Sequence, residues 1–93
     1  MGKILVQFTF SNLEAKVYEG VIRDLNAAGF GNIPERLFHA AAQNGKDWHL
    51  TDVWQSEDAF KQFGETMVPL LIKNRGTPVT PLVIPVHNII IPE

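Results

Sequence analysis

The chain has 93 residues, 45% of them hydrophobic, and contains no cysteine. This length fits a single domain over residues 1–93, because it leaves little room for a second hydrophobic core. The 8 Lys and Arg residues are set against 10 Asp and Glu, which gives a net charge of -2 and no basic stripe for a phosphate backbone, so we expect no nucleic-acid partner. The lack of cysteine excludes disulfides, thiol chemistry and sulfur-ligated metals, and is compatible with a reducing cytoplasm.

Residues 3–10 alternate in hydrophobicity and predict a first β-strand. One face of this strand is entirely apolar and carries Ile4, Val6, Phe8 and Phe10. The polar Gln7 breaks the apolar run, and the run is therefore far too short for a signal peptide or a membrane span. We therefore expect a cytoplasmic protein with no membrane partner.

A first helix is expected after this strand. Ser11 and Glu14 have the spacing of a capping box, in which each side chain accepts a backbone N–H at the helix start. Apolar residues then recur at helical spacing, at Val17, Tyr18, Val21, Ile22 and Leu25. Gly29 is expected to end the helix, with Phe30 covering its last turn.

A β-hairpin is the clearest local pattern in the chain. Residues 36–43 and 46–55 are predicted strands, and Asn44-Gly45 between them suits a two-residue turn with positive φ at both central positions. In the register that this turn predicts, Gln43 faces Lys46, Ala41 faces Trp48, His39 faces Leu50 and Leu37 faces Asp52. The face richer in chemistry then carries Leu37, His39, Ala41, Trp48, Leu50, Asp52 and Trp54.

The rest of the chain predicts a second helix and a last strand. Ser56 suits a helix N-cap, and Pro69 is expected to kink the helix or split it in two. The apolar stripe of this helix consists of Phe60, Phe63, Met67, Leu70 and Leu71. Residues 81–91 are then predicted to form a strand that is apolar on both faces, broken only at Pro85 and at the pair His87-Asn88.

The order of these elements is typical of an α+β fold of the ferredoxin-like βαββαβ kind, with two helices on one face of a four-stranded antiparallel sheet. The other sheet face and the second apolar face of the last strand then need a cover. The simplest cover for so small a domain is a second copy, so we expect a homodimer through the sheet face. The alternative is that one end of the last strand is an apolar tail.

The pair His39 and Asp52 is the main candidate for catalysis. On the predicted hairpin they are diagonal neighbours, close enough for a hydrogen bond through which the carboxylate sets the imidazole tautomer. Trp54 nearby could stack on a flat polar organic molecule while His39 exchanges a proton with it. The alternative is a histidine satisfied by Asp52 at the rim of the core. The residues expected to line the pocket are Trp54, Leu50, Leu37, His87 and Asn88.

The other two histidines do not suggest a metal site. His49 lies on the opposite face of the predicted hairpin from His39, and no short-spaced histidine pair offers the convergent ligands that zinc needs. His87 and Asn88 interrupt an apolar strand, so they form either a polar wall of the pocket or a hydrogen-bonded strand end. No metal is expected.

One run, on a strand that leads into a helix, resembles the acidic-x-Trp-x-Ser-x-x-Ala-Phe signature of the antibiotic biosynthesis monooxygenase-like family: Asp52-Val53-Trp54-Gln55-Ser56-Glu57-Asp58-Ala59-Phe60. The element order agrees over nearly the whole chain. The resemblance implies a dimeric α+β barrel, two sheets packed face to face, with a pocket in each subunit between sheet and helices. It also implies that Trp54 lines this pocket, as in the family's cofactor-independent oxygenases and haem-degrading members.

The resemblance also bears on cofactors. Haem-degrading members carry a proximal histidine on the second helix, at a position where this chain has Gly64, and the predicted helix has no histidine. No haem or other cofactor is therefore expected. The oxygenases of the family use a polar residue on the first strand, for which Gln7 and Thr9 are the candidates here.

Two functional hypotheses follow. The first is a cofactor-independent monooxygenase, or a related enzyme, that acts on a small aromatic or polyketide-like compound with His39 as base and Trp54 as platform. The second is a non-catalytic small-molecule-binding or structural dimer, motivated by the lack of any activated nucleophile or cofactor motif. A cavity of roughly a few hundred Å³ lined by His39 and Trp54 favours the enzyme, and a filled interior contradicts it.

Overall fold

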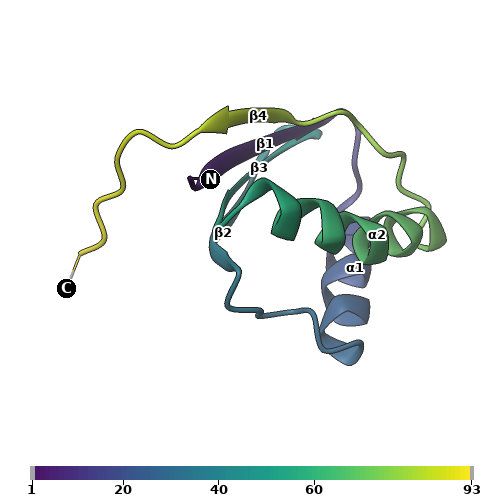
Figure 1. Cartoon of the computed structure of the whole chain (residues 1–93). Helices are drawn as coiled ribbons and strands as arrows, with labels where there is room; N and C mark the ends of the chain where they lie inside the picture. Colours follow the sequence, from purple (N-terminus) through teal and green to yellow (C-terminus); the bar gives the residue numbers. More distant parts are fainter. Residues whose placement is uncertain (1, 93) are drawn as a thin grey trace.

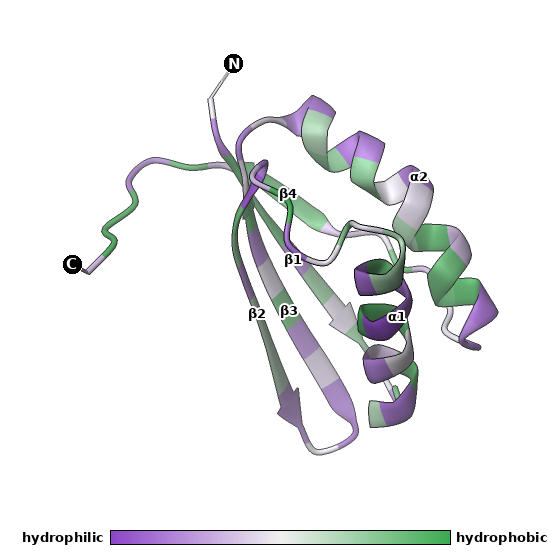
Figure 2. Ribbon diagram, turned by 90° about the horizontal axis from the view of Figure 1, so that it is seen from below, coloured by the Kyte–Doolittle hydropathy of each residue, from purple (hydrophilic) through white to green (hydrophobic). Residues whose placement is uncertain are grey.

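The computed structural model describes residues 2–92, which form four strands and two helices (Figure 1). In chain order the elements are β1 (Ile4–Phe10), α1 (Ala15–Ala27), β2 (Arg36–Asn44), β3 (Asp47–Trp54), α2 (Glu57–Lys73) and β4 (Leu82–Pro85). The sheet has the antiparallel strand order β2-β3-β1-β4, and both helices lie on one face of it (Figure 2). This confirms the predicted α+β, ferredoxin-like architecture. Within residues 2–92, neither helix is long and apolar enough to cross a bilayer.

The hydrophobic core lies between the sheet and the two helices. The alternating side chains predicted for β1 are all buried, namely Ile4, Val6, Phe8 and Phe10. They meet buried residues of both helices, which are Val17, Val21, Leu25, Phe63 and Leu71. Burial of a large apolar side chain contributes roughly 1.5–3 kcal/mol to the free energy of folding, so this layer holds both helices against β1.

The start of α1 differs from the prediction. The N-cap is Glu14, and no side chain accepts a hydrogen bond there, so the prediction that Ser11 caps this helix is wrong. Asn12 adopts a φ of 56°, and the Leu13 N–H donates to the Lys46 carbonyl at 3.1 Å. The chain is therefore tied to the hairpin turn over the residues where the predicted first turn of helix would lie.

The predicted end of α1 is confirmed. Gly29 follows the helix with a φ of 86°, a conformation that glycine adopts without steric cost. The Phe30 N–H donates to the Leu25 carbonyl at 2.8 Å, and the Gly29 N–H donates to the Asn26 carbonyl at 3.2 Å. These two bonds form a Schellman motif and direct the chain back toward the sheet.

The β2-β3 hairpin forms with a different register from the predicted one. Asn44 pairs with Asp47 across a turn whose first central residue, Gly45, has a φ of 63°. Glycine at the first central position is typical of a type II′ turn, whereas the prediction required positive φ at Asn44 as well. As a result, His39 pairs directly with Asp52 instead of Leu50. The shift is two residues along β3, so the side chains from Phe38 to Trp54 stay on their predicted faces.

A β-bulge near the start of β2 changes one predicted site residue. Arg36 pairs with Trp54 and Phe38 pairs with Val53, which leaves Leu37 without a partner in the ladder. Because a bulge adds one residue to a strand, the alternation of faces is interrupted there. Arg36 therefore shares the helix-covered face with His39, and the prediction that Leu37 lies on this face is wrong.

α2 begins where the sequence predicts. The Ser56 hydroxyl accepts a hydrogen bond from the Ala59 N–H at 3.1 Å and so caps the helix. Pro69 lies inside an unbroken helix, so the predicted split does not occur. Phe63 before the proline and Leu71 after it are both buried in the core, so both halves of the helix are anchored on the sheet.

The two serines allow a matched test of helix capping. Ser56→Ala is expected to lower the free energy of unfolding by about 1 kcal/mol, because the Ala59 N–H loses its acceptor. Ser11→Ala is expected to leave it unchanged, since Ser11 caps no helix. Urea denaturation of both variants checks this prediction, and equal losses for the two would contradict the observed helix starts.

β4 is much shorter than predicted. It covers only Leu82–Pro85 and pairs with β1 at the edge of the sheet. One further backbone hydrogen bond to the β1 side follows it, from the Val86 N–H to the Lys3 carbonyl at 2.9 Å. The segment after it leads away from the body of the domain (Figure 1). Ile90 and Ile91 are 84% and 76% exposed. Ile4, the first residue of β1, already pairs with Pro85, so the predicted strand over residues 81–91 is wrong beyond that point, and the alternative of an apolar tail is correct.

Candidate functional site

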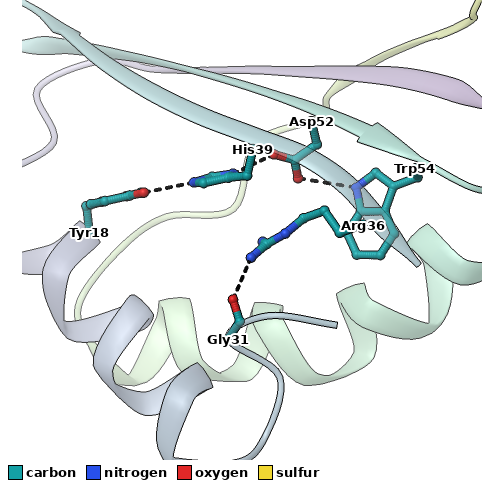
Figure 3. A network of polar contacts seen from close by, with 6 residues as sticks. All are labelled: Tyr18, Gly31, Arg36, His39, Asp52 and Trp54. Atoms are coloured by element: carbon teal, nitrogen blue, oxygen red, sulfur yellow. Dashed lines mark hydrogen bonds and ion pairs between the residues drawn. The ribbon is translucent and has the colours of Figure 1, made fainter. Parts of the chain in front are cut away.

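A chain of polar side chains lies on the helix-covered face of the sheet (Figure 3). The Tyr18 hydroxyl of α1 is 2.8 Å from His39 Nε2 on β2. His39 Nδ1 is 2.5 Å from Asp52 Oδ1 on β3, and the Trp54 Nε1–H donates to Asp52 Oδ2 at 3.2 Å. Three elements thus bring together groups that are far apart in the sequence.

The hydrogen bonds among these polar side chains select one tautomer of His39. Asp52 is 4% exposed, and each oxygen of its carboxylate has one partner. A carboxylate only accepts, so His39 donates from Nδ1 and keeps a lone pair on Nε2. The Tyr18 hydroxyl donates to that lone pair. The arrangement gives the imidazole the orientation and tautomer of a proton acceptor supported by a carboxylate.

Aromatic packing holds Tyr18, the outermost residue of this row of hydrogen-bonded side chains. The Tyr18 and His39 rings lie end to end and nearly in one plane, with centroids 6.2 Å apart and an interplanar angle of 6° (Figure 3). The face of the Tyr18 ring stacks on Trp48 with centroids 5.1 Å apart, and the Trp48 Nε1–H donates to the Leu13 carbonyl at 2.9 Å. The tyrosine is thus held by Trp48, with its hydroxyl aimed at His39.

Burial changes the acidity of Tyr18. Desolvation raises the pKa of its hydroxyl above the ordinary value of 10.0; the Arg36 cation opposes this rise, and the Asp52 carboxylate adds to it. The unfolded chain therefore releases this proton at lower pH than the folded chain does. The contribution of Tyr18 to stability is fully present below about pH 10 and is lost as the pH rises through the folded pKa.

The titration of Tyr18 predicts a pH-dependent stability. Between about pH 9 and about pH 11, the free energy of unfolding is expected to fall more steeply in the wild type than in Tyr18→Phe, which has no hydroxyl to ionise. Urea denaturation across this range measures the two slopes. Because Tyr18 is the chain's one tyrosine, phenolate absorbance reports its ionisation directly. Parallel slopes for the two proteins would contradict the raised pKa.

A small apolar cavity adjoins the polar chain. Its volume is about 60 Å³, and its polar lining comes from Tyr18, Arg36, His39 and Asp52. Its apolar lining comes from β1, β3, both helices and the segment before α1, and consists of Phe8, Phe10, Leu13, Val21, Ile22, Leu25, Leu50, Phe63, Met67 and Leu71. The cavity is smaller than the few hundred Å³ expected for a pocket that encloses a substrate, but the interior is not filled.

Trp54 lies behind the cavity wall and does not line it. Its side chain is 0% exposed and packs against Phe60 and Phe63 of α2, with ring centroids 5.8 and 4.9 Å apart. The contact confirms that the Trp54 face of the sheet meets the helices. Its indole is covered by protein, and its one polar atom is bonded to Asp52.

The structure brings together only some of the predicted site residues. His39, Asp52 and Leu50 share the cavity, and Trp54 supports Asp52 from behind. Leu37, His87 and Asn88 are exposed and lie along a groove on the other side of the sheet, beside Lys3, Leu5, Phe38, Val53 and residues 86–92. The prediction that they line one pocket with His39 is therefore wrong, because of the bulge at Leu37 and the early end of β4 at Pro85.

Sequence reasoning missed Tyr18 and Arg36. Tyr18 was assigned to the apolar stripe of the first helix, although a tyrosine on a buried face needs a partner for its hydroxyl, and this requirement was a usable signal. Arg36 enters the site because the bulge places it on the helix-covered face. A bulge leaves no clear mark in a single sequence, so nothing in the pattern could have placed Arg36 there.

The remaining histidines are separate from this site. His49 pairs with Ala42, is exposed, and lies on the sheet face opposite to His39, as predicted. Among residues 2–92, no three His, Asp or Glu side chains are grouped so that they could hold a metal ion.

Comparison with known proteins gives one informative similarity. No family model matches the chain, and no curated protein matches it. Among solved structures, it is similar to a candidate antibiotic biosynthesis monooxygenase from Caulobacter crescentus CB15, with a TM-score of 0.61 over 95% of this chain and 91% of that chain, and 20% identity. At this identity the similarity shows a shared fold. The resemblance of the Asp52–Phe60 run to that family is thus confirmed at the level of the ferredoxin-like α+β fold.

Proposed function

We propose that this protein is a cofactor-independent oxygenase that acts on a small, mostly apolar molecule with a weakly acidic C–H or O–H group. The observation that carries the proposal is the Tyr18-His39-Asp52 chain ending at the wall of an apolar cavity. The fold shared with the Caulobacter crescentus protein supports the same reaction class. Such a site combines one oriented base with mostly apolar surroundings.

The proposed chemistry follows from the tautomer of His39. A ligand that displaces the Tyr18 hydroxyl presents its acidic proton to His39 Nε2, and the Asp52 carboxylate stabilises the imidazolium that forms. The electron pair left on an activated methylene carbon passes to molecular oxygen. One oxygen atom stays on that carbon as a carbonyl, and the other leaves as water with the two methylene hydrogens, so no external reductant is needed.

The volume of the cavity limits the size of the substrate to less than the sequence suggested. A volume of about 60 Å³ is well below that of typical enclosed pockets, so a polyketide-like compound does not fit this conformation. A molecule of a few heavy atoms, such as a small 1,3-diketone or enol, is the proposed substrate. The unbranched side chain of Met67 on the cavity wall adapts to such a ligand more easily than a branched one.

A non-catalytic binding or structural role is the second candidate. It is favoured by the complete hydrogen bonding of the site, since no half-buried or buried side chain among residues 2–92 has a fully covered polar atom without a partner. In that case Tyr18, His39 and Asp52 serve as a polar staple between α1 and the sheet. The two candidates differ in whether His39 exchanges a proton with a ligand.

Oxygen uptake distinguishes the two candidates. The purified protein is incubated with small 1,3-diketones and enols, including acetylacetone, and oxygen consumption is followed with an electrode. Wild-type protein is expected to consume oxygen with at least one of them, and His39→Gln to be slower by about 100-fold or more. His49→Gln, on the opposite sheet face, is the matched control and should keep full activity. No uptake by the wild type, or equal rates with and without His39, would contradict the oxygenase.

We also propose that the helix-free face of the sheet pairs with a second copy of the chain. The ladder pairings place apolar residues of all four strands on this face, namely Leu5, Phe38, Val53, Leu82 and Ile84. Phe38 is 53% exposed, which is unusual for so large an apolar side chain. Light scattering is expected to give twice the 10.4 kDa of the monomer, and Phe38→Glu to shift it toward the monomer. A stable 10.4 kDa particle for the wild type would contradict this assembly.

A further inference from the structure

Arg36 is the one cationic side chain that lines the cavity. It is half-buried at the start of β2, and its Nη2–H donates to the Gly31 carbonyl at 3.0 Å (Figure 3). Its Cζ lies 5.3 Å from the centre of the Phe63 ring, so the guanidinium is held between the loop before β2 and an aromatic face of α2. These contacts fix the direction of the side chain without neutralising its charge.

The charge of Arg36 has no carboxylate partner within residues 2–92. The ion pairs of that part of the chain involve other cations, and Asp52, the carboxylate of the site, uses its oxygens for His39 and Trp54. A guanidinium has five N–H donors, and Gly31 accepts from one of them. A half-buried cation without an ion-pair partner is an unusual arrangement, because a buried charge normally has a partner.

We propose that Arg36 determines ligand specificity by binding an anionic oxygen of the ligand, so that the cavity selects small organic anions. The inference rests on the proposed function in one respect only, that the ligand occupies this cavity. A planar guanidinium suits the paired oxygens of a carboxylate or of an enolised diketone. The oxygen can thus belong to a carboxylate that the substrate already carries, or to the enolate that forms when His39 takes a proton.

Two probes separate these sources. The first arm compares isobutyrate with isobutyramide, which has the same shape and no charge, by NMR titration of the wild-type chain. The second arm follows the ultraviolet spectrum of acetylacetone, whose enolate absorbs differently from its enol. Both arms are repeated with Arg36→Met, which removes the charge, with Arg36→Lys, which keeps the charge and loses the planar fork, and with Arg23→Met, an exposed arginine outside the cavity, as control.

Wild type is expected to bind isobutyrate about tenfold more tightly than isobutyramide, or to raise the ionised fraction of bound acetylacetone, or both. Arg36→Met should abolish the preference while leaving isobutyramide affinity unchanged, and Arg36→Lys should keep part of it. A response in the first arm alone assigns a substrate carboxylate, and a response in the second alone assigns an enolate. If Arg36→Met does not fold, the partial loss in Arg36→Lys relative to Arg23→Met carries the test.

A wild type without anion preference in either arm, or a preference that survives in Arg36→Met, would overturn the assignment. The outcome is separable from that of the oxygenase proposal. An anion preference that depends on Arg36 in a protein that consumes no oxygen would leave the anion site intact and remove only the oxygenase. Oxygen uptake that depends on His39 but not on Arg36 would leave the oxygenase intact and remove only the anion site.

Discussion

Trp54→Ala is expected to lower the free energy of unfolding by about 3–5 kcal/mol, a large part of the roughly 5–15 kcal/mol available to a domain. Trp54 has the largest fully buried side chain in the described part of the chain, and it packs against Phe60 and Phe63 of α2. Its removal leaves a cavity between β3 and α2 and deprives Asp52 of one hydrogen-bond donor. Urea denaturation followed by circular dichroism measures the loss.

Trp54→Phe is the matched variant. Phenylalanine keeps much of the aromatic contact with α2 but cannot donate to Asp52, so its loss should be clearly smaller than that of Trp54→Ala. A loss below about 1 kcal/mol in Trp54→Ala would show that the indole is not the anchor of α2 on the sheet.

Among Tyr18, His39 and Asp52, the change Asp52→Ala is expected to be the most damaging, at about 2–4 kcal/mol of unfolding free energy. Asp52 accepts from both His39 Nδ1 and Trp54 Nε1, and alanine leaves these two donors without an acceptor in a buried place. Because the cost of an unmade buried bond exceeds the gain of a made one, the loss should exceed that of a single hydrogen bond. Urea denaturation at neutral pH measures it.

Asp52→Asn separates the stability role from the proton-transfer role. The amide has the same shape, and its oxygen can accept from one of the two donors, so the loss of stability should be smaller than in Asp52→Ala. If the amide nitrogen faces His39, it favours the tautomer with the proton on Nε2, and the Tyr18 hydroxyl can no longer donate there. Loss of oxygen uptake with a modest loss of stability is the expected result, and full activity in Asp52→Asn would contradict a role for the tautomer.

Much of the fold could be predicted from the sequence because it depends on local patterns. The alternation of β1 matches its buried face residue by residue, and the glycine at position 29 ends α1 as expected. The Ser56 cap and the stripe of α2 are also found. These features depend on side-chain period and on the conformational freedom of single residues, both of which a sequence shows directly.

The predictions that failed depend on competition between local and tertiary contacts. Ser11 has the right spacing for a cap, but the bond from Leu13 to Lys46 ties that segment to the hairpin. The apolar residues after Pro85 have strand propensity, yet propensity does not provide a pairing partner within this chain. The hairpin register required a choice between turn types that an Asn-Gly pair does not settle.

The candidate site was predicted in part for a simple reason. A register shift of two residues preserves the faces, so His39 and Asp52 stay together and become direct neighbours. Tyr18 reaches them only through the packing of α1 on the sheet, and Arg36 only through the bulge. Contacts of this kind join elements that are far apart in sequence, and a single sequence holds no record of them.

The most direct test of the central claim is nitrogen NMR of the three histidine rings in isotopically labelled protein. His49 and His87 are exposed and lie outside the cavity, so they serve as controls within the same sample. We predict that neutral His39 carries its proton on Nδ1, and that adding acetylacetone shifts the His39 ring signals while those of the other two stay in place. A proton on Nε2, or a His39 signal that does not respond to saturating probe, would contradict an acid–base site at this cavity.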